Sequence, residues 1–168
     1  MAVENLKTTS ITNLDATPII RANPWVHGGN SKQFSGTVEV SAAASIASTY
    51  RFFRVGSWMR PVQLRLFCDA LTAGAIDIGL ARTAADGGAY VDQDFFASAV
   101  ALGSALNGTD VTYEAATAAS MDIANIEKRI WEVLALTSDP NLEYDVVATV
   151  TTAITATGTV SLAAIFSW

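Results

Sequence analysis

Residues 49–83, which read TYRFFRVGSWMRPVQLRLFCDALTAGAIDIGLART, decide the fold class of this chain. Turn-forming or small residues at Gly56-Ser57 and at 72–74 divide the stretch into three short apolar runs. Such spacing is typical of consecutive antiparallel strands. In the second and third runs, every other residue is apolar. The core face that this alternation predicts consists of Val62, Leu64, Leu66, Cys68, Ile76, Ile78 and Leu80.

The first run, 49–55, has no purely apolar face. Tyr50, Phe52 and Arg54 alternate with Arg51, Phe53 and Val55, so each face would carry both aromatic and cationic side chains. We therefore expect this strand both to pack on the core and to meet a neighbouring molecule. Arg65 and Phe67, on the outer face of the second run, are predicted to belong to the same interface.

Further alternation predicts strands at 34–40, near 110–114, at 143–150 and at 159–168. The last two are the cleanest and are expected to form a hairpin through 151–158. Residues 41–48 fit a helical turn or a loop, and we favour a loop. Residues 91–106 are weakly helical, with Asp92 or Asp94 as N-cap, and 125–134 is an amphipathic helix capped by Asn125.

Together these segments predict an all-β protein. The expected architecture is an antiparallel β-sandwich of the jelly-roll type with one short α-helix and an extended N-terminal arm. The arm covers residues 1–32 and the single sandwich domain covers residues 33–168.

The arm is interrupted too often by Pro, Gly and Asn for a helix, yet apolar residues recur through it. Ordering such a segment costs about 1–2 kcal/mol per residue in backbone entropy, so its apolar side chains need a surface to dock on. That surface could belong to its own domain, a sister subunit or a larger partner. The predicted contact residues are Leu6, Leu14, Ile19, Ile20 and Trp25.

The composition excludes several classes of protein. With 51% hydrophobic and 15% charged residues the chain is not disordered, and its low charge suits a surface packed against neighbours. A net charge of −6 with scattered basic residues argues against nucleic acid as a partner. No apolar run has the length of a membrane span, and the first residues do not resemble a signal peptide.

No motif carries recognisable chemistry, so we expect no enzyme, no catalytic residue and no cofactor. Cys68 lies on a predicted core face, and His27, the sole histidine, sits far from it in the arm. Asp92, Asp94 and Asp110 suggest calcium, but the glycine and terminal glutamate of an EF-hand loop are missing at the required spacing. A cap or turn role is the better interpretation, and no metal site is predicted.

The order of features resembles a family. The opening MAVENLKTTSITNLDATP, the runs at 49–55 and 62–70, VDQDFFASAVAL at 91–102 and WEVLALTSDP at 131–140 resemble small structural proteins of tailed bacteriophages. These are capsid decoration, or cement, proteins, and the likeness spans nearly the whole chain.

This resemblance implies a jelly roll, commonly a homotrimer, that sits on the outside of the head and bridges copies of the major capsid protein. The protein would then be made in the bacterial host cytoplasm and reside in the virion. The alternative function is a carbohydrate- or host-surface-binding jelly roll, as in a head fibre or a tail-associated protein. That function needs exposed aromatic side chains, for which the candidates are Trp25, Trp58 and Tyr90.

Overall fold

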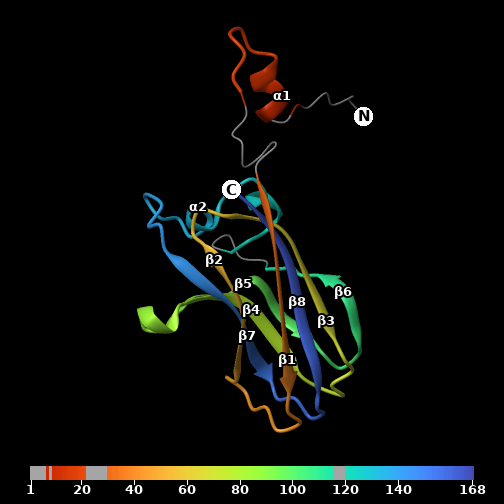
Figure 1. Ribbon diagram of the computed structural model, residues 1–168. Helices are drawn as coiled ribbons and strands as arrows, with labels where there is room; N and C mark the ends of the chain where they lie inside the picture. Colours follow the sequence, from red (N-terminus) through yellow and green to blue (C-terminus); the bar gives the residue numbers. More distant parts are fainter. Residues whose placement is uncertain (1–6, 8, 22–29, 116–119) are drawn as a thin grey trace, which may run out of the picture.

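The structure, a computed structural model, describes residues 7, 9–21, 30–115 and 120–168 and is a sandwich of two four-stranded sheets (Figure 1). The first sheet has the order β1 (Ser31–Val40), β8 (Gly158–Ser167), β3 (Arg60–Cys68) and β6 (Leu106–Asp110). The second has the order β2 (Thr49–Gly56), β7 (Glu143–Thr152), β4 (Ala75–Arg82) and β5 (Tyr90–Ala101). All neighbouring strands are antiparallel, which confirms the predicted all-β sandwich.

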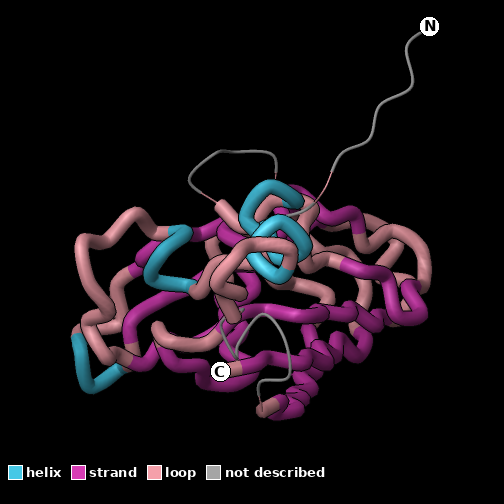
Figure 2. Tube along the Cα trace, turned by 90° about the horizontal axis from the view of Figure 1, so that it is seen from above, coloured by secondary structure: helices cyan, strands magenta, loops and turns pink. Residues whose placement is uncertain are grey.

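The strand order is that of a jelly roll. β1 pairs with β8, β2 with β7, β3 with β6 and β4 with β5, as in a long antiparallel ribbon that is wrapped into two sheets. Viewed from above, the strands form the body of the molecule and the short helical segments lie outside it (Figure 2).

The predicted pairing of neighbours in sequence is wrong. The three runs of residues 49–83 become β2, β3 and β4, which alternate between the two sheets and do not pair with one another. The expected hairpin of 143–150 with 159–168 is wrong too, because β7 and β8 lie in different sheets. Apart from β4 with β5, the strands of a wrapped ribbon pair with strands that are distant in sequence, so the other connections cross between sheets.

The helix predicted at 91–106 is instead the long strand β5. Its register against β4 shifts repeatedly, so that Ile78 faces Ala97 while Leu80 faces Asp92. These bulges interrupt the alternation of inward and outward residues, and Phe95, Phe96 and Ala97 are all buried although they are consecutive. Because apolar and polar residues do not alternate along this segment, its sequence was interpreted as a helix.

The amphipathic helix predicted at 125–134 is much shorter in the structure. It consists of a 3₁₀ turn, Ile123–Asn125, and the single turn α2, Ile130–Val133. Asn125 caps neither, because its buried side-chain amide donates to the carbonyl of Ser120 at 2.9 Å. The start of α2 is held by the Glu132 carboxylate, which accepts from the backbone N–H of Arg129 at 2.8 Å.

Two other boundaries differ from the predictions. The arm, expected to contain no helix, has the short α1 at Thr9–Leu14, since Pro18 follows that helix instead of interrupting it. The strand expected at 110–114 is wrong, because β6 spans Leu106–Asp110 and residues 111–114 form no strand. The loop at 41–48 is as predicted, and a 3₁₀ turn at Ala84–Asp86 leads to Gly87 at φ 84°.

The core between the sheets contains all but one of the predicted core residues. Leu64, Leu66, Cys68, Ile76, Ile78 and Leu80 are buried. Val62 is 38% exposed, because an irregularity in the register of β3 against β8 between Pro61 and Gln63 turns Pro61 inward and Val62 outward.

The face of β4 opposite to Ile76, Ile78 and Leu80 is also buried. Asp77 accepts hydrogen bonds from the backbone N–H of Ala99 and the side-chain amide of Gln93, both at 2.8 Å. A Cβ atom at Gly79 would collide with the backbone oxygens of Asp92 and Gln93. The bulged strand β5 thus packs over β4.

Candidate interaction surfaces

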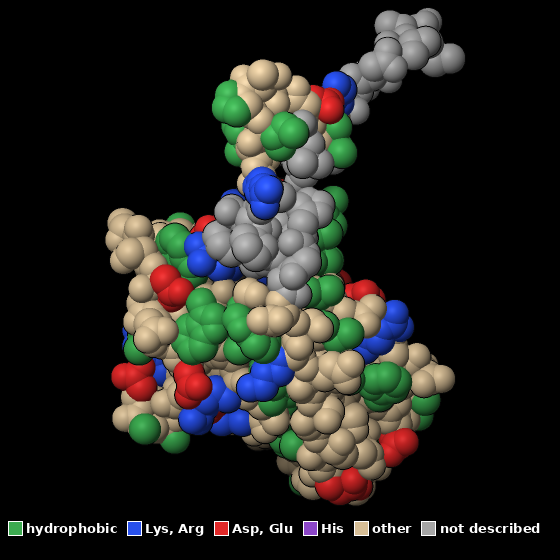
Figure 3. Space-filling model, turned by 45° about the horizontal axis from the view of Figure 1, so that its top comes forward, with side chains coloured by type: hydrophobic (Ala, Val, Ile, Leu, Met, Phe, Trp, Pro, Cys, Tyr) green, Lys and Arg blue, Asp and Glu red, His purple; other side chains and the backbone are tan. Residues whose placement is uncertain are grey.

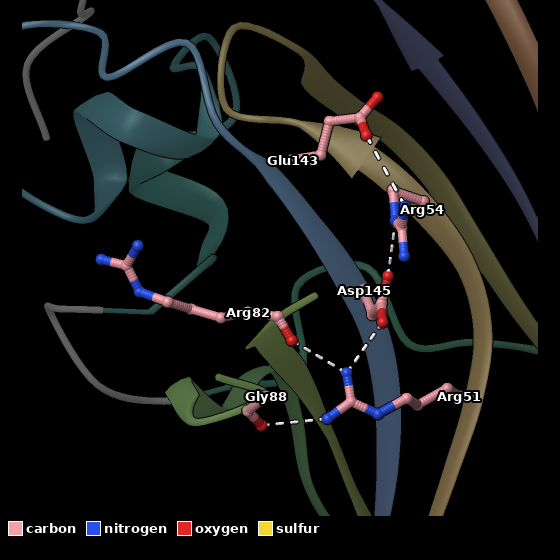
Figure 4. A network of polar contacts seen from close by, with 6 residues as sticks. All are labelled: Arg51, Arg54, Arg82, Gly88, Glu143 and Asp145. Atoms are coloured by element: carbon pink, nitrogen blue, oxygen red, sulfur yellow. Dashed lines mark hydrogen bonds and ion pairs between the residues drawn. The ribbon is translucent and has the colours of Figure 1, made fainter. Parts of the chain in front are cut away.

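Arg51 and Arg54 of β2 converge on one carboxylate of the neighbouring strand, Asp145 of β7 (Figure 4). Arg51 Nη1 and Arg54 Nε each donate to an oxygen of Asp145 at 2.8 Å. Arg51 also donates to the carbonyls of Arg82 and Gly88, both at 2.9 Å, and thereby reaches the turn between β4 and β5. The network connects three strands of the second sheet and the turn beside them.

Both arginines lie on the outer face of the sheet, which the alternation did not predict. A register shift between Arg51 and Phe53 turns Phe53 toward the core, where its ring stacks on Phe34 with centroids 5.4 Å apart. Burial by itself would raise the pKa of Asp145, but the hydrogen bonds from Arg54 and Arg51 outweigh it and lower the pKa. The arginine side chains remain 37% and 49% exposed, so each retains a surface for a neighbour.

Arg65 and Phe67 lie on the outer face of the other sheet. Arg65 donates to the carbonyl of Gly108 at 3.2 Å, and the Phe67 ring lies against the same glycine. Between β1 and β3 this face has a hollow of about 290 Å³, whose floor is formed by Ala163 of β8. The other lining residues are Gln33, Phe34, Ser35, Gln63, Arg65, Ala164 and Ile165.

The predicted interface of 50–55 with Arg65 and Phe67 is therefore divided. Its two parts belong to β2 and β3, which lie in opposite sheets, and their outward side chains point away from each other. One flat partner cannot cover both outer faces, so the two groups belong to separate surfaces.

The predicted arm residues are partly within the described part of the chain. Ile19 and Ile20 are 65% and 53% exposed, as is Ile11 of α1 at 47%. Leu14 ends α1, whereas Leu6 and Trp25 lie outside the described residues. The arm bends back on itself, since Ile20 N–H donates to the carbonyl of Asn13 at 3.0 Å and Lys7 pairs with Asp15 at 2.7 Å.

A second apolar surface lies at the end of the sandwich that the arm leaves, here called the arm-side end. Its exposed members are Val62, Ile123, Ile126 and Trp168. Arg60 connects them: its backbone pairs with Ser167, and its guanidinium donates to the carbonyl of Ile126 at 3.0 Å. The Trp168 N–H donates to the carbonyl of Asn30, at the root of the arm.

Figure 3 shows exposed hydrophobic side chains both on the arm and on the body below it. The arm-side end was not predicted, because Val62 was assigned to the core and Ile126 lies within the predicted amphipathic helix 125–134. The signal that could have found it is Ile123, an apolar residue that precedes that helix.

An apolar hollow of about 350 Å³, here called the Leu136 hollow, lies beside the end of α2. It is bounded by the end of β4, the starts of β5 and β7, and the loop after α2. Its lining residues are Arg82, Val91, Leu134, Leu136, Pro140, Leu142 and Tyr144. Leu136 is 40% exposed, and Arg82 is held at the rim by Asp86 at 2.7 Å.

Asp92 and Asp94 of β5 carry two carboxyl groups close together. Burial, followed by the hydrogen bond and the charge of Asp94, raises the pKa of Asp92 to about 6. Asp94 N–H and the Ser120 hydroxyl donate to Asp92 at 3.3 and 3.5 Å. Neither aspartate caps a helix, contrary to the prediction.

Other candidate chemical groups lead to no site. Within the described ranges, no three His, Cys, Asp or Glu side chains gather as metal ligands would. Burial, followed by the charge of Asp69, raises the pKa of Cys68 to about 11, so its thiol is unreactive at neutral pH. His27 lies outside the described residues. None of the described helices has the length and apolar character that crossing a bilayer requires.

Comparison with known proteins gives little by sequence. No protein-family model matches the chain, and no curated protein matches it. Among solved structures, the fold is similar to a chain of the cyanophage Pam1 capsid asymmetric unit. The identity is 13%, the TM-score is 0.49, and the match covers 88% of this chain and 91% of that one.

Proposed function

We propose that this chain is a structural protein of a tailed-bacteriophage head, a decoration or cement protein without catalytic activity. It would bind the outside of the head as a homotrimer, after synthesis in the host cytoplasm, and stabilise contacts between major capsid protein subunits. The observation that carries the proposal is the gathering of exposed apolar side chains on the arm and on the arm-side end.

Exposed apolar side chains in contiguous groups mark contact surfaces of proteins. Ile123 is 78% exposed and lies three residues before the exposed Ile126, and the described isoleucines of the arm are 47–65% exposed. The low charge of the chain also suits a molecule packed among neighbours. The resemblance of its sequence to decoration proteins names the class of neighbour, a capsid lattice.

A cement protein works by burying surface across subunit boundaries, so that these contacts must break before the shell opens. Each occupied site is stabilised by mass action, by about 2.7 kcal/mol when the free protein is at 100 times its Kd. Two or more attachment points on one trimer convert later contacts into intramolecular ones and raise the avidity.

Two candidate aromatic residues for glycan binding have structural roles in the sandwich. Trp58 fills the space over Gly56, where a Cβ atom would meet the indole ring, and the Tyr90 hydroxyl shares a hydrogen bond with Thr149 at 2.8 Å. We therefore do not propose glycan binding, and binding on a glycan array would contradict this choice.

The test is cosedimentation of the purified protein with phage heads that lack it. We expect saturable binding, and heads that withstand higher temperature once the protein is bound. The double variant Ile123→Asp/Ile126→Asp should bind several-fold more weakly. Its matched control is Ile46→Asp, which changes an isoleucine that is 65% exposed in the loop between β1 and β2.

Failure of the unmodified protein to bind heads would overturn the proposal. If Ile46→Asp and the double variant lose binding equally, the arm-side end is not the surface that contacts the head. The mass of the purified protein in solution tests the trimer separately.

A further inference from the structure

We propose that the folded part of the arm, residues 9–21 and here called the hook, seats in the Leu136 hollow of a second copy of this chain. The inference rests on the arm being a contact element, as in the proposed function. It concerns contacts between copies, which can be tested without heads.

The hook has the properties of a segment that needs a partner surface. α1 has six residues, and isolated helices this short are marginal in water unless their apolar side is covered. The hydrogen bond from Ile20 N–H to Asn13 and the ion pair of Lys7 with Asp15 give it a shape. They leave Ile11, Ile19 and Ile20 between 47% and 65% exposed.

The Leu136 hollow has the matching properties. Six of its seven lining residues are apolar or aromatic, and the seventh, Arg82, already has Asp86 as its partner. The hollow over β1, β8 and β3 has four polar residues among its eight lining residues, and the hollow beside Arg51 has three charged residues among five. Branched aliphatic side chains such as those of Ile19 and Ile20 are the natural occupants of an open apolar hollow of about 350 Å³.

The charges beside the two partners also match. Arg21, which is exposed, directly follows Ile20 in the hook. Asp139, which precedes Pro140, places one carboxylate beside the hollow, whereas Asp86 is already paired with Arg82. A hook seated by its isoleucines would bring Arg21 toward Asp139, where opposite charges favour the docked orientation.

We infer a second copy as the occupant, because the isoleucines of the hook stay exposed within the single chain. In the structure the hook lies beyond the arm-side end, with its isoleucines exposed (Figure 1). About ten residues connect Ile20 to Asn30, a length that can extend up to ~35 Å from the body. Each copy then gives one hook and receives one, a head-to-tail contact that closes into a ring when the rotation permits.

Cross-linking between two single-cysteine variants tests the contact. Both carry Cys68→Ala, so that the buried native thiol takes no part. One adds Ile20→Cys and the other Leu136→Cys, both at exposed positions where folding tolerates the change. The two purified full-length proteins are mixed and treated with a short bismaleimide. We expect a cross-linked dimer at several-fold higher yield than in the control mixture of Ile20→Cys with Ile46→Cys.

A dimer yield no higher than in the control would overturn the inference. A cross-link formed within one chain in the double variant Ile20→Cys/Leu136→Cys, with none between chains in the mixture, would also overturn it. Cosedimentation with heads is measured on the same proteins. If no cross-link forms but the protein still binds heads, only this inference is overturned. If the cross-link forms but the protein does not bind heads, only the proposed function is contradicted.

Discussion

At the scale of single residues, the Asp92 carboxyl group is placed where its charge is unfavourable. It is partly buried on β5, and the carboxyl group of Asp94 lies close to it. The backbone N–H of Asp94 also donates to Asp92. A raised pKa means that the folded protein prefers the protonated form of Asp92. The contribution to stability is therefore fully present below the unfolded pKa of about 4 and is lost as pH rises to about 6.

We expect Asp92→Asn to stabilise the protein at pH 7 by about 1 kcal/mol, a figure reduced for the solvent that reaches this half-buried group. Asparagine keeps the hydrogen bonding but not the charge. Urea unfolding at pH 4, 5, 6 and 7 should show the fall in stability in the unmodified protein and a smaller one in the variant. A variant less stable than the parent at pH 7 would contradict this account, and Asp86→Asn, in the exposed pair, is the control.

The residue scale is also where the sequence pattern predicted the core well. Leu64, Leu66 and Ile78 were assigned correctly, because regular strands alternate and burial follows the alternation. Val62 was assigned to the wrong face, and Arg51 and Arg54 were assigned to opposite faces although both point outward, because a register shift lies beside these residues. A bulge depends on the partner strand, and a single sequence does not show which strand that is.

At the scale of elements, the Asp145 carboxylate connects β2, an edge strand, to the rest of its sheet. It accepts from two arginines of β2, and one of them continues to the carbonyls of Arg82 and Gly88. The Asp145 side chain is only 11% exposed, whereas the two arginine side chains are 37% and 49% exposed. The carboxylate is therefore largely shielded from water, and solvent screens the charges of the arginines.

We expect Asp145→Asn to lower the free energy of unfolding by about 1–2 kcal/mol, since two charge-assisted hydrogen bonds lose their acceptor charge. The exposed pair of Arg82 with Asp86 is the comparison, and Asp86→Asn should cost less, about 0–1 kcal/mol. The lowered pKa of Asp145 means that its contribution is present above about pH 4 and is lost as pH falls below that value. Chemical denaturation at pH 7 and pH 3 measures both effects, and equal losses in the two variants would contradict the account.

Strands were easier to predict than their pairing or their interruptions. β3, β4, β7 and β8 were found within about two residues, because alternation is a local property. β5 was mistaken for a helix, because its bulges break the alternation. The hairpin expected of β7 and β8 was wrong, since the choice of partner is fixed by how the whole ribbon wraps. For the candidate surfaces, the sequence indicated the arm isoleucines but not the arm-side end or the Leu136 hollow.

At the scale of the whole molecule, we expect the sandwich and the arm to have different roles. The core cluster lies between the sheets, whereas the described arm residues are mostly exposed. Stability should therefore reside in residues 30–168, and the capacity to assemble should depend on the arm.

We expect deletion of residues 1–29 to leave the thermal midpoint unchanged within about 2 °C, a shift that corresponds to less than 1 kcal/mol for a domain of this size. The same deletion should strongly weaken association between copies and binding to heads. Calorimetry, sedimentation and cosedimentation measure the three effects. A truncated protein that assembles and binds heads as the full chain does would show that the arm is dispensable.

The position of β8 has a consequence for how this protein is made. Residues 158–167 form an interior strand of the first sheet, between β1 and β3, and β1 spans the sequence back to Ser31 to pair with Ser167. Most close contacts thus join residues far apart in sequence, a property that goes with slow folding. The first sheet cannot assemble before residue 167 has left the ribosome. Until then the apolar side chains of β1 and β3 remain exposed, because β8, which pairs with both, has not been made. We expect the nascent chain to need a chaperone most during this interval.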